Sequence, residues 1–259
     1  MAKLLHMPRN LYCRQRGYCC IKIDGLQFYC DSQHMNFWTN VHHGKWETQT
    51  LYILSTFLTP ESIYCDIGAW IGPTVLHAAK RCKKVYCFEP DRVSYEYLLS
   101  NIRRNQLNNV IPFNLALTNR DGLTKIGTFA KSFGRSKSSL INGHMKGAME
   151  VPEVSWSTAI RLFGPENIDF LKIDIEGAEY DLIPHLSVCL TNKKPKIYLS
   201  LHPQFLQKDV RVQKTKRLLE SMQIYRNCYD SSLNKLSLDE LLCPPYIDGC
   251  QEVLFTDED

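Results

Sequence analysis

The chain has 259 residues, of which 44% are hydrophobic and 22% charged, so it can bury a full core and is unlike a disordered protein. Its formal net charge of +4 is too small to indicate nucleic-acid binding by itself. There is neither a charged-then-apolar leader nor a run of about 18 apolar residues. The sequence therefore predicts a cytoplasmic protein without a membrane span.

Eleven cysteines are a high count for this length. Their number is odd, no Cys-x-x-Cys occurs, and several fall inside expected strands. This pattern favours reduced and mostly buried thiols over a disulfide framework. A zinc site is less favoured still, because no pair of cysteines has ligand spacing.

The first part of the chain predicts an N-terminal extension, residues 1–44, ahead of a main domain, residues 45–259. Residues 18–31 alternate in polarity around Asp24-Gly25, a dipeptide typical of a two-residue hairpin turn. Residues 33–44 are rich in histidine and aromatic residues without periodicity; a loop of this kind can line a pocket, but a packed loop is the more common outcome. A helix is expected over residues 46–57.

Residues 62–91 have the pattern strand, glycine turn, helix, strand, with Asp66 and Glu89 at the strand ends. Gly68 and Gly72 allow the backbone to turn tightly and to approach a ligand closely. Pro73 suits the first turn of a helix, where its missing N–H would be unpaired anyway. The stretch indicates a nucleoside-binding βαβ unit.

The charge of this unit indicates which nucleoside it binds. The pattern Asp66-x-Gly68-x-x-x-Gly72 has no third glycine in register, unlike a dinucleotide site, and its carboxylate would repel a diphosphate. It would suit the ammonium of S-adenosylmethionine, which carries a sulfonium and no phosphate. Glu89 follows Asp66 by 89 − 66 = 23 residues, near the offset of about 20 expected for an acid that binds ribose hydroxyls.

The rest of the chain alternates between helices and strands. We expect helices at 92–106, 155–163 (capped by Ser157 or Thr158), 177–190 and 208–222, and strands at 110–117, 168–175, 196–203, 224–229 and 252–255. A further edge strand is expected within 118–135, and 136–151 is a polar loop, either over a site or on the surface. The pattern predicts one α/β, Rossmann-like domain with a mostly parallel, doubly wound sheet and antiparallel C-terminal strands, whose ligands bind at the carboxyl ends of the strands.

The helix expected at 208–222 is basic and amphipathic, with Val212, Leu218 and Leu219 predicted to face inward. Its positive charges are more typical of a solvated face than of a nucleic-acid contact.

A second acidic strand end lies at residues 169–179. Lys172 interrupts an apolar strand, and Asp174 and Glu176 are two residues apart, so both point the same way; Glu179 follows one turn later. Several carboxylates at one sheet edge are costly unless they meet a cation. A sulfonium, an ammonium, a metal ion or Lys172 could supply it.

Four segments together resemble the FkbM family of S-adenosylmethionine-dependent methyltransferases: CDIGAWIG (65–72), CFEPD (87–91), NLALTNRDG (114–122) and DFLKIDIEGAEYDLI (169–183). The resemblance extends over roughly residues 46–205 and includes Trp46-Glu47. Ser200 departs from the family's usual acid two residues before the histidine, and Ala159 stands in a segment that lacks the Asp often found there.

The resemblance implies a class I methyltransferase fold with S-adenosylmethionine as cofactor. Asp66, Gly68 and Gly72 would hold its methionyl end, Glu89 its ribose diol, and Asn114 and Ala116 its adenine. The full set of expected cofactor-binding residues is Asp66, Gly68, Ala69, Gly72, Glu89, Pro90, Asn114, Ala116 and Asp174.

Asp174, Glu176, Lys172 and His202 are the expected catalytic residues. A sugar hydroxyl must lose a proton during methylation, and either His202, which lies at a strand end, or Asp174 is the candidate base. No metal site is predicted, although a metal that bridges Asp174 and Glu176 to a sugar diol is an open alternative.

The sequence favours an O-methyltransferase for a hydroxyl of a sugar, glycan or related small molecule. The alternatives are an RNA ribose 2′-O-methyltransferase, supported only by the basic residues 208–217, and an inactive cofactor-binding module, suggested by Ser200 and Ala159. Oxidoreduction with NAD is the least supported.

Overall fold

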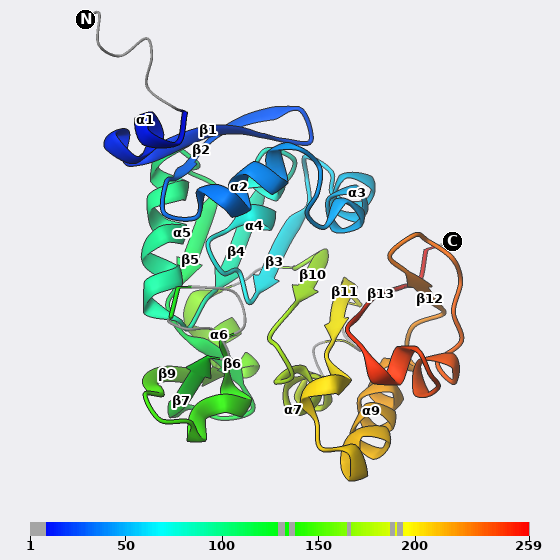
Figure 1. Ribbon diagram of the computed structural model, residues 1–259. Coiled ribbons are helices and arrows are strands. Elements are labelled where there is room, and N and C mark those ends of the chain that lie inside the picture. Colours follow the sequence, from blue (N-terminus) through cyan, green and yellow to red (C-terminus); the bar gives the residue numbers. More distant parts are fainter. Residues whose placement is uncertain are drawn as a thin grey trace, which may run out of the picture.

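A seven-stranded sheet forms the centre of the computed structural model, which describes residues 9–128, 133–134, 138–164, 167–186, 190 and 194–258 (Figure 1). Its strand order is β12-β13-β11-β10-β3-β4-β5, and β13 alone runs opposite to the other six strands. The strands are β3 (Ile63–Ile67), β4 (Lys84–Phe88), β5 (Val110–Phe113), β10 (Phe170–Ile173), β11 (Lys196–Leu201), β12 (Asn227–Asp230) and β13 (Gln251–Thr256). The mostly parallel α/β sheet expected from the sequence is confirmed.

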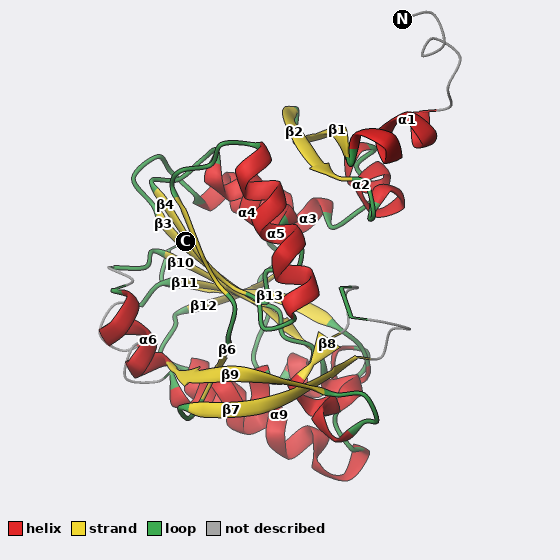
Figure 2. Ribbon diagram, turned by 90° about the vertical axis from the view of Figure 1, so that its left-hand side faces the viewer, coloured by secondary structure: helices red, strands yellow, loops and turns green. Residues whose placement is uncertain are grey.

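Helices cover both faces of this sheet, because successive side chains of each strand point to opposite sides. On one face Tyr64, Phe170 and Tyr198 pack into a cluster with the helices α3 (Thr48–Phe57), α4 (Pro73–Ala79) and α5 (Arg92–Arg104). The other face packs against α6 (Trp156–Phe163), α7 (Glu179–Leu182) and α9 (Lys208–Met222). Figure 2 shows α4 and α5 on one side of the sheet and α9 on the other.

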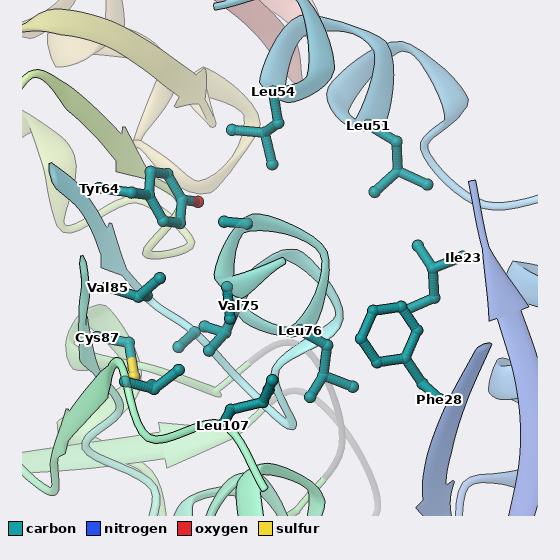
Figure 3. Packing of buried hydrophobic residues seen from close by; sticks show 14 of the residues in the cluster. Ile23, Phe28, Leu51, Leu54, Tyr64, Val75, Leu76, Val85, Cys87 and Leu107 are labelled. Carbon is teal, nitrogen blue, oxygen red and sulfur yellow. The ribbon is translucent and has the colours of Figure 1, made fainter. Parts of the chain in front are cut away.

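The N-terminal hairpin is packed onto this core. Its strands are β1 (Tyr18–Ile23) and β2 (Leu26–Asp31), and Asp24 and Gly25 at the turn both have the positive φ that such turns require. In Figure 3, Leu76 of α4 points toward Phe28 of the hairpin, and all three of Leu76, Phe28 and Ile23 are fully buried. The hairpin thus extends the same hydrophobic cluster; the domain division at residue 44 stays a prediction.

The packed loop expected over residues 33–44 is wrong, because a helix, α2 (Met35–His42), forms there. The sequence did not predict this helix, because the aromatic residues and Asn of the segment have low helix propensity. Tertiary contacts supply the stability: Trp38 is fully buried and its Nε1 donates to Asp31 Oδ2 at 2.9 Å. Asp31 Oδ1 also accepts the N–H groups of Gln33 and His34, which fixes the chain that leads into α2. A further short helix, α1 (Arg9–Arg16), precedes the hairpin.

A second, four-stranded sheet was not expected. It has the order β6-β9-β7-β8, with β6 (Ala116–Thr118), β7 (Gly122–Thr128), β8 (Ser138–Ser139) and β9 (Met149–Ser155). The single strand expected at 110–117 is split, because the side chain of Asn114 donates to the carbonyl oxygens of Glu89 and Pro90 and turns the chain out of the central sheet. The expected edge strand corresponds to β7, and residues 129–132 and 135–137 of the expected strand and loop lie outside the described residues.

Several smaller expectations also need correction. Ser155, not Ser157 or Thr158, caps α6, since its side chain accepts the N–H of Thr158. Among the described residues of the helix expected at 177–190, the structure has α7, a 3₁₀ turn at Ile183–His185 and a helical residue at 190; residues 187–189 are not described. Val212 on α9 is 51% exposed rather than inward-facing. Further 3₁₀ turns lie at Leu140–His144, Pro203–Phe205, Glu240–Leu242 and Tyr246–Asp248.

Ten cysteines lie within the described residues, and all ten are free thiols, seven of them buried. The eleventh, Cys189, is outside those residues. None of the helices described in the structure has the length and apolar character needed to cross a membrane.

Candidate active site

A cavity of about 320 Å³ opens where β3, β4 and β10 end, a size typical of small-molecule sites. Its wall contains four carboxylates and one ammonium group, which suits a cationic ligand without phosphate: Glu47, Glu89, Asp174, Glu176 and Lys172. Of the residues expected at the site, the wall includes Gly68, Ala69, Glu89, Pro90, Ala116, Lys172, Asp174 and Glu176, but not Asp66, Gly72, Asn114 or His202.

The turn after β3 brings two strand ends into contact. Gly68 has φ +90°, and a Cβ at this position would overlap the carbonyl oxygen of Asp174. The N–H groups of Gly68 and Ala69 both donate to the carbonyl oxygen of Phe88, which ties the turn to β4. Gly72 also has φ +90°, but its close neighbour is Leu98 of α5, so it serves helix packing. The glycine at position 68 is therefore what allows the β3 turn to touch the end of β10.

Glu89 is held at the end of β4 by backbone donors. Its Oε2 accepts the N–H of Trp70 at 2.7 Å and its Oε1 accepts the N–H of Asp91 at 2.8 Å. Burial raises the pKa of Glu89 to about 8. Each oxygen keeps a lone pair for one more donor, so the carboxylate matches the two hydroxyls of a ribose diol. The side chain of Asn114 donates a hydrogen bond to the carbonyl oxygen of Glu89 and does not line the cavity, whereas Ala116 does.

Lys172 lies between two carboxylates because of sheet register. Lys172 is paired with Asp66 across the parallel strands β10 and β3, and Asp174 lies two residues further on the same face. Its Nζ is 3.8 Å from Asp66 Oδ1 and 3.2 Å from Asp174 Oδ2. Burial alone would lower the pKa of Lys172, but the carboxylates of Asp174, Asp66 and Glu47 outweigh it and raise the pKa above its ordinary value. Lys172 is therefore a permanent cation.

Asp66 is fully buried and lies behind the cavity wall. Its Oδ2 accepts the hydroxyl of Thr74 at 2.5 Å, and its Oδ1 has no hydrogen-bond partner among the described residues. Burial raises the pKa of this carboxyl, although Lys172 and Thr74 oppose the shift. Lys172 and Thr74, which both lie next to Asp66, line the cavity.

His202 follows β11 and faces three carboxylates. Its Nε2 is 3.6 Å from Asp174 Oδ1 and 3.8 Å from Glu176 Oε2. On the other side, Glu179 Oε1 accepts the backbone N–H of His202 at 2.8 Å and lies 3.2 Å from Nδ1. Burial alone would lower the pKa of His202, but hydrogen bonds with Cys250 and Glu179 and the charges of Glu179 and Asp174 raise it to about 11. The imidazole is thus protonated at neutral pH.

The two cations keep Asp174 ionised. Burial opposes ionisation, but Lys172 and His202 together lower the pKa of Asp174 below its ordinary value. Glu179, which is fully buried, was noted in the sequence as a neighbour of this group but not assigned a role. Its contact with His202 shows that it orients the imidazole.

Sequence reasoning missed the N-terminal wall of the cavity. Phe37 of α2 and Trp46 line it together with Trp70, and the rings of Phe37 and Trp70 are 4.5 Å apart. Three non-glycine residues of the wall have left-handed backbone: Glu47 (φ 35°), Trp70 (φ 48°) and Glu176 (φ 52°). Such strained residues cluster at functional sites. The sequence signals for this wall were the aromatic segment 33–44, which can line a pocket, and Trp46-Glu47 in the family resemblance.

Residues 66–226, more than half of the chain, match the model of the Methyltransferase FkbM domain. No curated protein matches the sequence. Among solved structures, the FkbM methyltransferase of Methylobacillus flagellatus KT is 16% identical with a TM-score of 0.50, and the match covers 86% of this chain and 53% of that one.

Two structures with lower similarity are Trm5b from Pyrococcus abyssi and TYW2 from M. jannaschii in complex with AdoMet. Trm5b is 12% identical with a TM-score of 0.45, covering 92% of this chain and 55% of that one. TYW2 is 14% identical with a TM-score of 0.42, covering 92% and 84%. This chain spans about half the length of the first two of these three structures.

The cavity fits the cofactor of the matched family. The glycine turn at Gly68, the diol-binding geometry of Glu89 and the excess of carboxylates suit S-adenosylmethionine, which has a ribose, two cationic groups in its methionyl part and no phosphate. The chain belongs to the FkbM family of S-adenosylmethionine-dependent methyltransferases, with a class I methyltransferase fold.

Proposed function

We propose that this protein is an O-methyltransferase that acts on a hydroxyl of a sugar, a glycan or a related small molecule. The observation that carries the proposal is the pair of carboxylates, Asp174 and Glu176, at the cavity wall beside the His202 imidazolium. Carboxylates accept hydrogen bonds from hydroxyls, and a sugar presents adjacent hydroxyls that a pair of carboxylates can hold.

The residues that would hold the methyl donor follow from the cavity wall. Glu89 would accept the ribose hydroxyls, the turn at Gly68 and Ala69 would allow close backbone approach, and Pro90 and Ala116 would contact the adenine. S-adenosylmethionine supplies an electrophilic methyl group on a positively charged sulfur. Since sulfonium is already a good leaving group, much of the work left to the protein is to align the acceptor oxygen with that methyl.

The two candidate bases named from the sequence are both poorly matched to neutral pH. His202 already carries a proton, since its pKa is raised to about 11. Asp174, whose pKa is lowered, stays ionised and is a weak base. In this proposal Asp174 and Glu176 orient the acceptor hydroxyl, and His202 and Lys172 fix the position and charge of Asp174.

The test is methyl transfer from labelled S-adenosylmethionine to separated pools of glycans, RNA and small metabolites. The proposal expects label in the glycan or sugar pool, with an Asp174→Asn variant much less active. Cofactor binding by calorimetry without transfer to any pool would instead support an inactive module. Label confined to RNA would overturn the choice of acceptor.

An RNA ribose as acceptor has less support in the structure. Two of the basic residues on α9 are engaged within the protein, Arg211 with Asp248 at 3.1 Å and Lys214 with Asp181 at 3.2 Å. None of the residues of α9 lines the cavity. An RNA acceptor would make activity fall steeply with salt, whereas transfer to a neutral sugar is expected to change little.

We also propose that the protein works in the cytoplasm. The seven buried free thiols among the described residues suit a reducing compartment. Fractionation of cells that express the tagged chain tests this, and recovery in a secreted fraction would contradict it.

A further inference from the structure

Glu47 occupies an unusual position in the cavity wall. It immediately precedes α3 and has φ 35°, a left-handed conformation that costs about 1–3 kcal/mol for a residue other than glycine. Glu47 is one of the residues that line the cavity, together with Lys172 and Asp174. A strained backbone at a carboxylate residue of a ligand cavity points to a functional role for that residue.

The charges around Glu47 come from two strands of the sheet. Lys172 and Asp174 face it from β10, and Glu252 faces it from β13. Lys172 is shared with Asp66 and Asp174, so it cannot serve Glu47 alone. Burial raises the pKa of Glu47; Lys172 opposes this and Asp174 and Glu252 add to it, so that the pKa reaches about 7.

Glu252 is fixed behind Glu47 by hydroxyl donors. Tyr198 OH donates to Glu252 Oε2 at 2.7 Å, and Thr50 Oγ1 lies 3.4 Å from both oxygens. Glu252 is also the cross-strand partner of Ser200, the position where this sequence lacks the acid usual in its family. Glu252 on β13 is thus a further carboxylate near Glu47, and its charge adds to the effects of burial and Asp174 that raise the pKa of Glu47.

Three other charged residues of the site each keep one state near neutral pH. Asp174 remains an anion, and Lys172 and His202 remain cations. Glu89 also has a raised pKa, but backbone N–H groups hold both of its oxygens in the diol-binding position. Glu47 lines the same cavity and, with a pKa of about 7 and the Thr50 hydroxyl as a hydrogen-bond donor, can gain and lose a proton near neutral pH.

We propose that Glu47 is the general base of the reaction, which rests on the proposed transfer to a hydroxyl. The acceptor O–H bond breaks as its proton passes to the Glu47 carboxylate, and the oxygen lone pair forms the new bond to the methyl carbon. The carbon–sulfur bond breaks with its electron pair left on sulfur, which becomes a neutral thioether. Glu47 then releases the proton to solvent, so the net products are a methyl ether, the thioether and one proton.

The first test needs neither cofactor nor acceptor. Infrared difference spectra between the wild type and Glu47→Gln, recorded from about pH 5 to about pH 9, isolate the carboxyl band of Glu47. We expect a protonated band that disappears with a midpoint near neutral pH. A carboxylate that is ionised over the whole range would overturn the proposal.

The second test separates proton abstraction from cofactor binding. Glu47→Gln is expected to lower kcat by about 10²–10⁴-fold and to remove the acidic limb of its pH profile, with unchanged calorimetric affinity for S-adenosylhomocysteine. Glu47→Asp, which keeps the carboxylate, should recover part of kcat. Weaker S-adenosylhomocysteine binding with full kcat at saturation would overturn the proposal and make Glu47 an ammonium-binding residue instead.

Glu96→Gln is the matched control, because Glu96 is an exposed residue of α5 that pairs only with Arg92 in the described residues. It should leave both kcat and affinity unchanged. Failure of the proposed function would look different: the wild type would transfer no methyl to a glycan or sugar, whatever the infrared titration of Glu47 shows.

Discussion

Asp66 and Asp174 share one lysine but have opposite environments. Lys172 Nζ lies 3.8 Å from Asp66 and 3.2 Å from Asp174, yet the Asp66 side chain is fully buried and that of Asp174 is 27% exposed. Burial raises the pKa of Asp66, whereas Lys172 and His202 overcome burial and lower that of Asp174. The acid of the glycine motif therefore lies behind the cavity wall, whereas the acid at the end of β10 is part of the wall.

A substitution at the contact between the turn after β3 and the end of β10 is expected to have the largest effect. Gly68→Ala would place a Cβ on the carbonyl oxygen of Asp174 and force a residue other than glycine to adopt φ +90°. We expect a loss of at least about 3 kcal/mol in the free energy of unfolding, or no folded protein. Urea denaturation of the purified variant measures this.

Gly249→Ala is the control for this substitution. Gly249 has extended backbone, and an added Cβ would come no closer than 3.9 Å to a neighbouring atom. Its stability should stay within about 0.5 kcal/mol of the wild type. Equal stabilities for the two alanine variants would contradict the contact at Gly68.

Asp174 lines the cavity and Asp66 does not, so substitutions at the two positions should affect activity unequally. Asp174→Asn should lower kcat by about 10²-fold or more, because it removes a charge from the reacting end of the cavity. Asp66→Asn, behind the wall, should change kcat by less than about tenfold at saturating methyl donor. Asp209→Asn, an exposed residue of α9, is the control for loss of a carboxylate. A larger effect at Asp66 than at Asp174 would reverse the comparison.

The hydrogen bond from Thr74 to Asp66 can be tested without altering the carboxylate of Asp66 or that of Asp174. Thr74→Val removes the hydroxyl that donates to Asp66 Oδ2 and leaves that buried oxygen without its partner. The variant should lose about 1–3 kcal/mol of unfolding free energy. Thermal or urea unfolding measures the loss, and an unchanged stability would show that the hydrogen bond does not hold Asp66.

The two acids should also respond oppositely to pH. The pKa of Asp174 is lowered on folding, so its contribution to stability is present above the ordinary value of 3.8 and is lost as the pH falls through its folded pKa. The pKa of Asp66 is raised, so its contribution is present below 3.8 and is lost as the pH rises through its folded pKa. The stability cost of Asp174→Asn should therefore shrink toward acid, and that of Asp66→Asn should shrink toward neutral pH. Urea unfolding at several pH values measures both trends; parallel trends would contradict the assignment.

Much of the central sheet follows from the sequence, because strands buried on both faces are continuous apolar runs that end in loops with chemistry-bearing residues. Local patterns could not show α2, whose Trp38 and Asp31 contacts depend on the folded chain. They also could not show that Asn114 bends the chain into a second sheet.

The same limit applies to the site. The motifs located Glu89, Lys172 and Asp174, which all line the cavity. The depth of Asp66 depends on strand register with Lys172 and on Thr74, and the charge of His202 depends on Glu179. Neither the burial of a side chain nor its protonation state can be predicted from the spacing of residues along the chain.

The most direct test of the account is a crystal structure of the protein with S-adenosylhomocysteine bound. The account predicts that the ribose hydroxyls bind Glu89 and that the thioether sulfur lies on the Asp174 side of the cavity, with Asp66 still buried behind Lys172. A ligand bound elsewhere, or one whose ammonium displaces Lys172 to contact Asp66 directly, would contradict it.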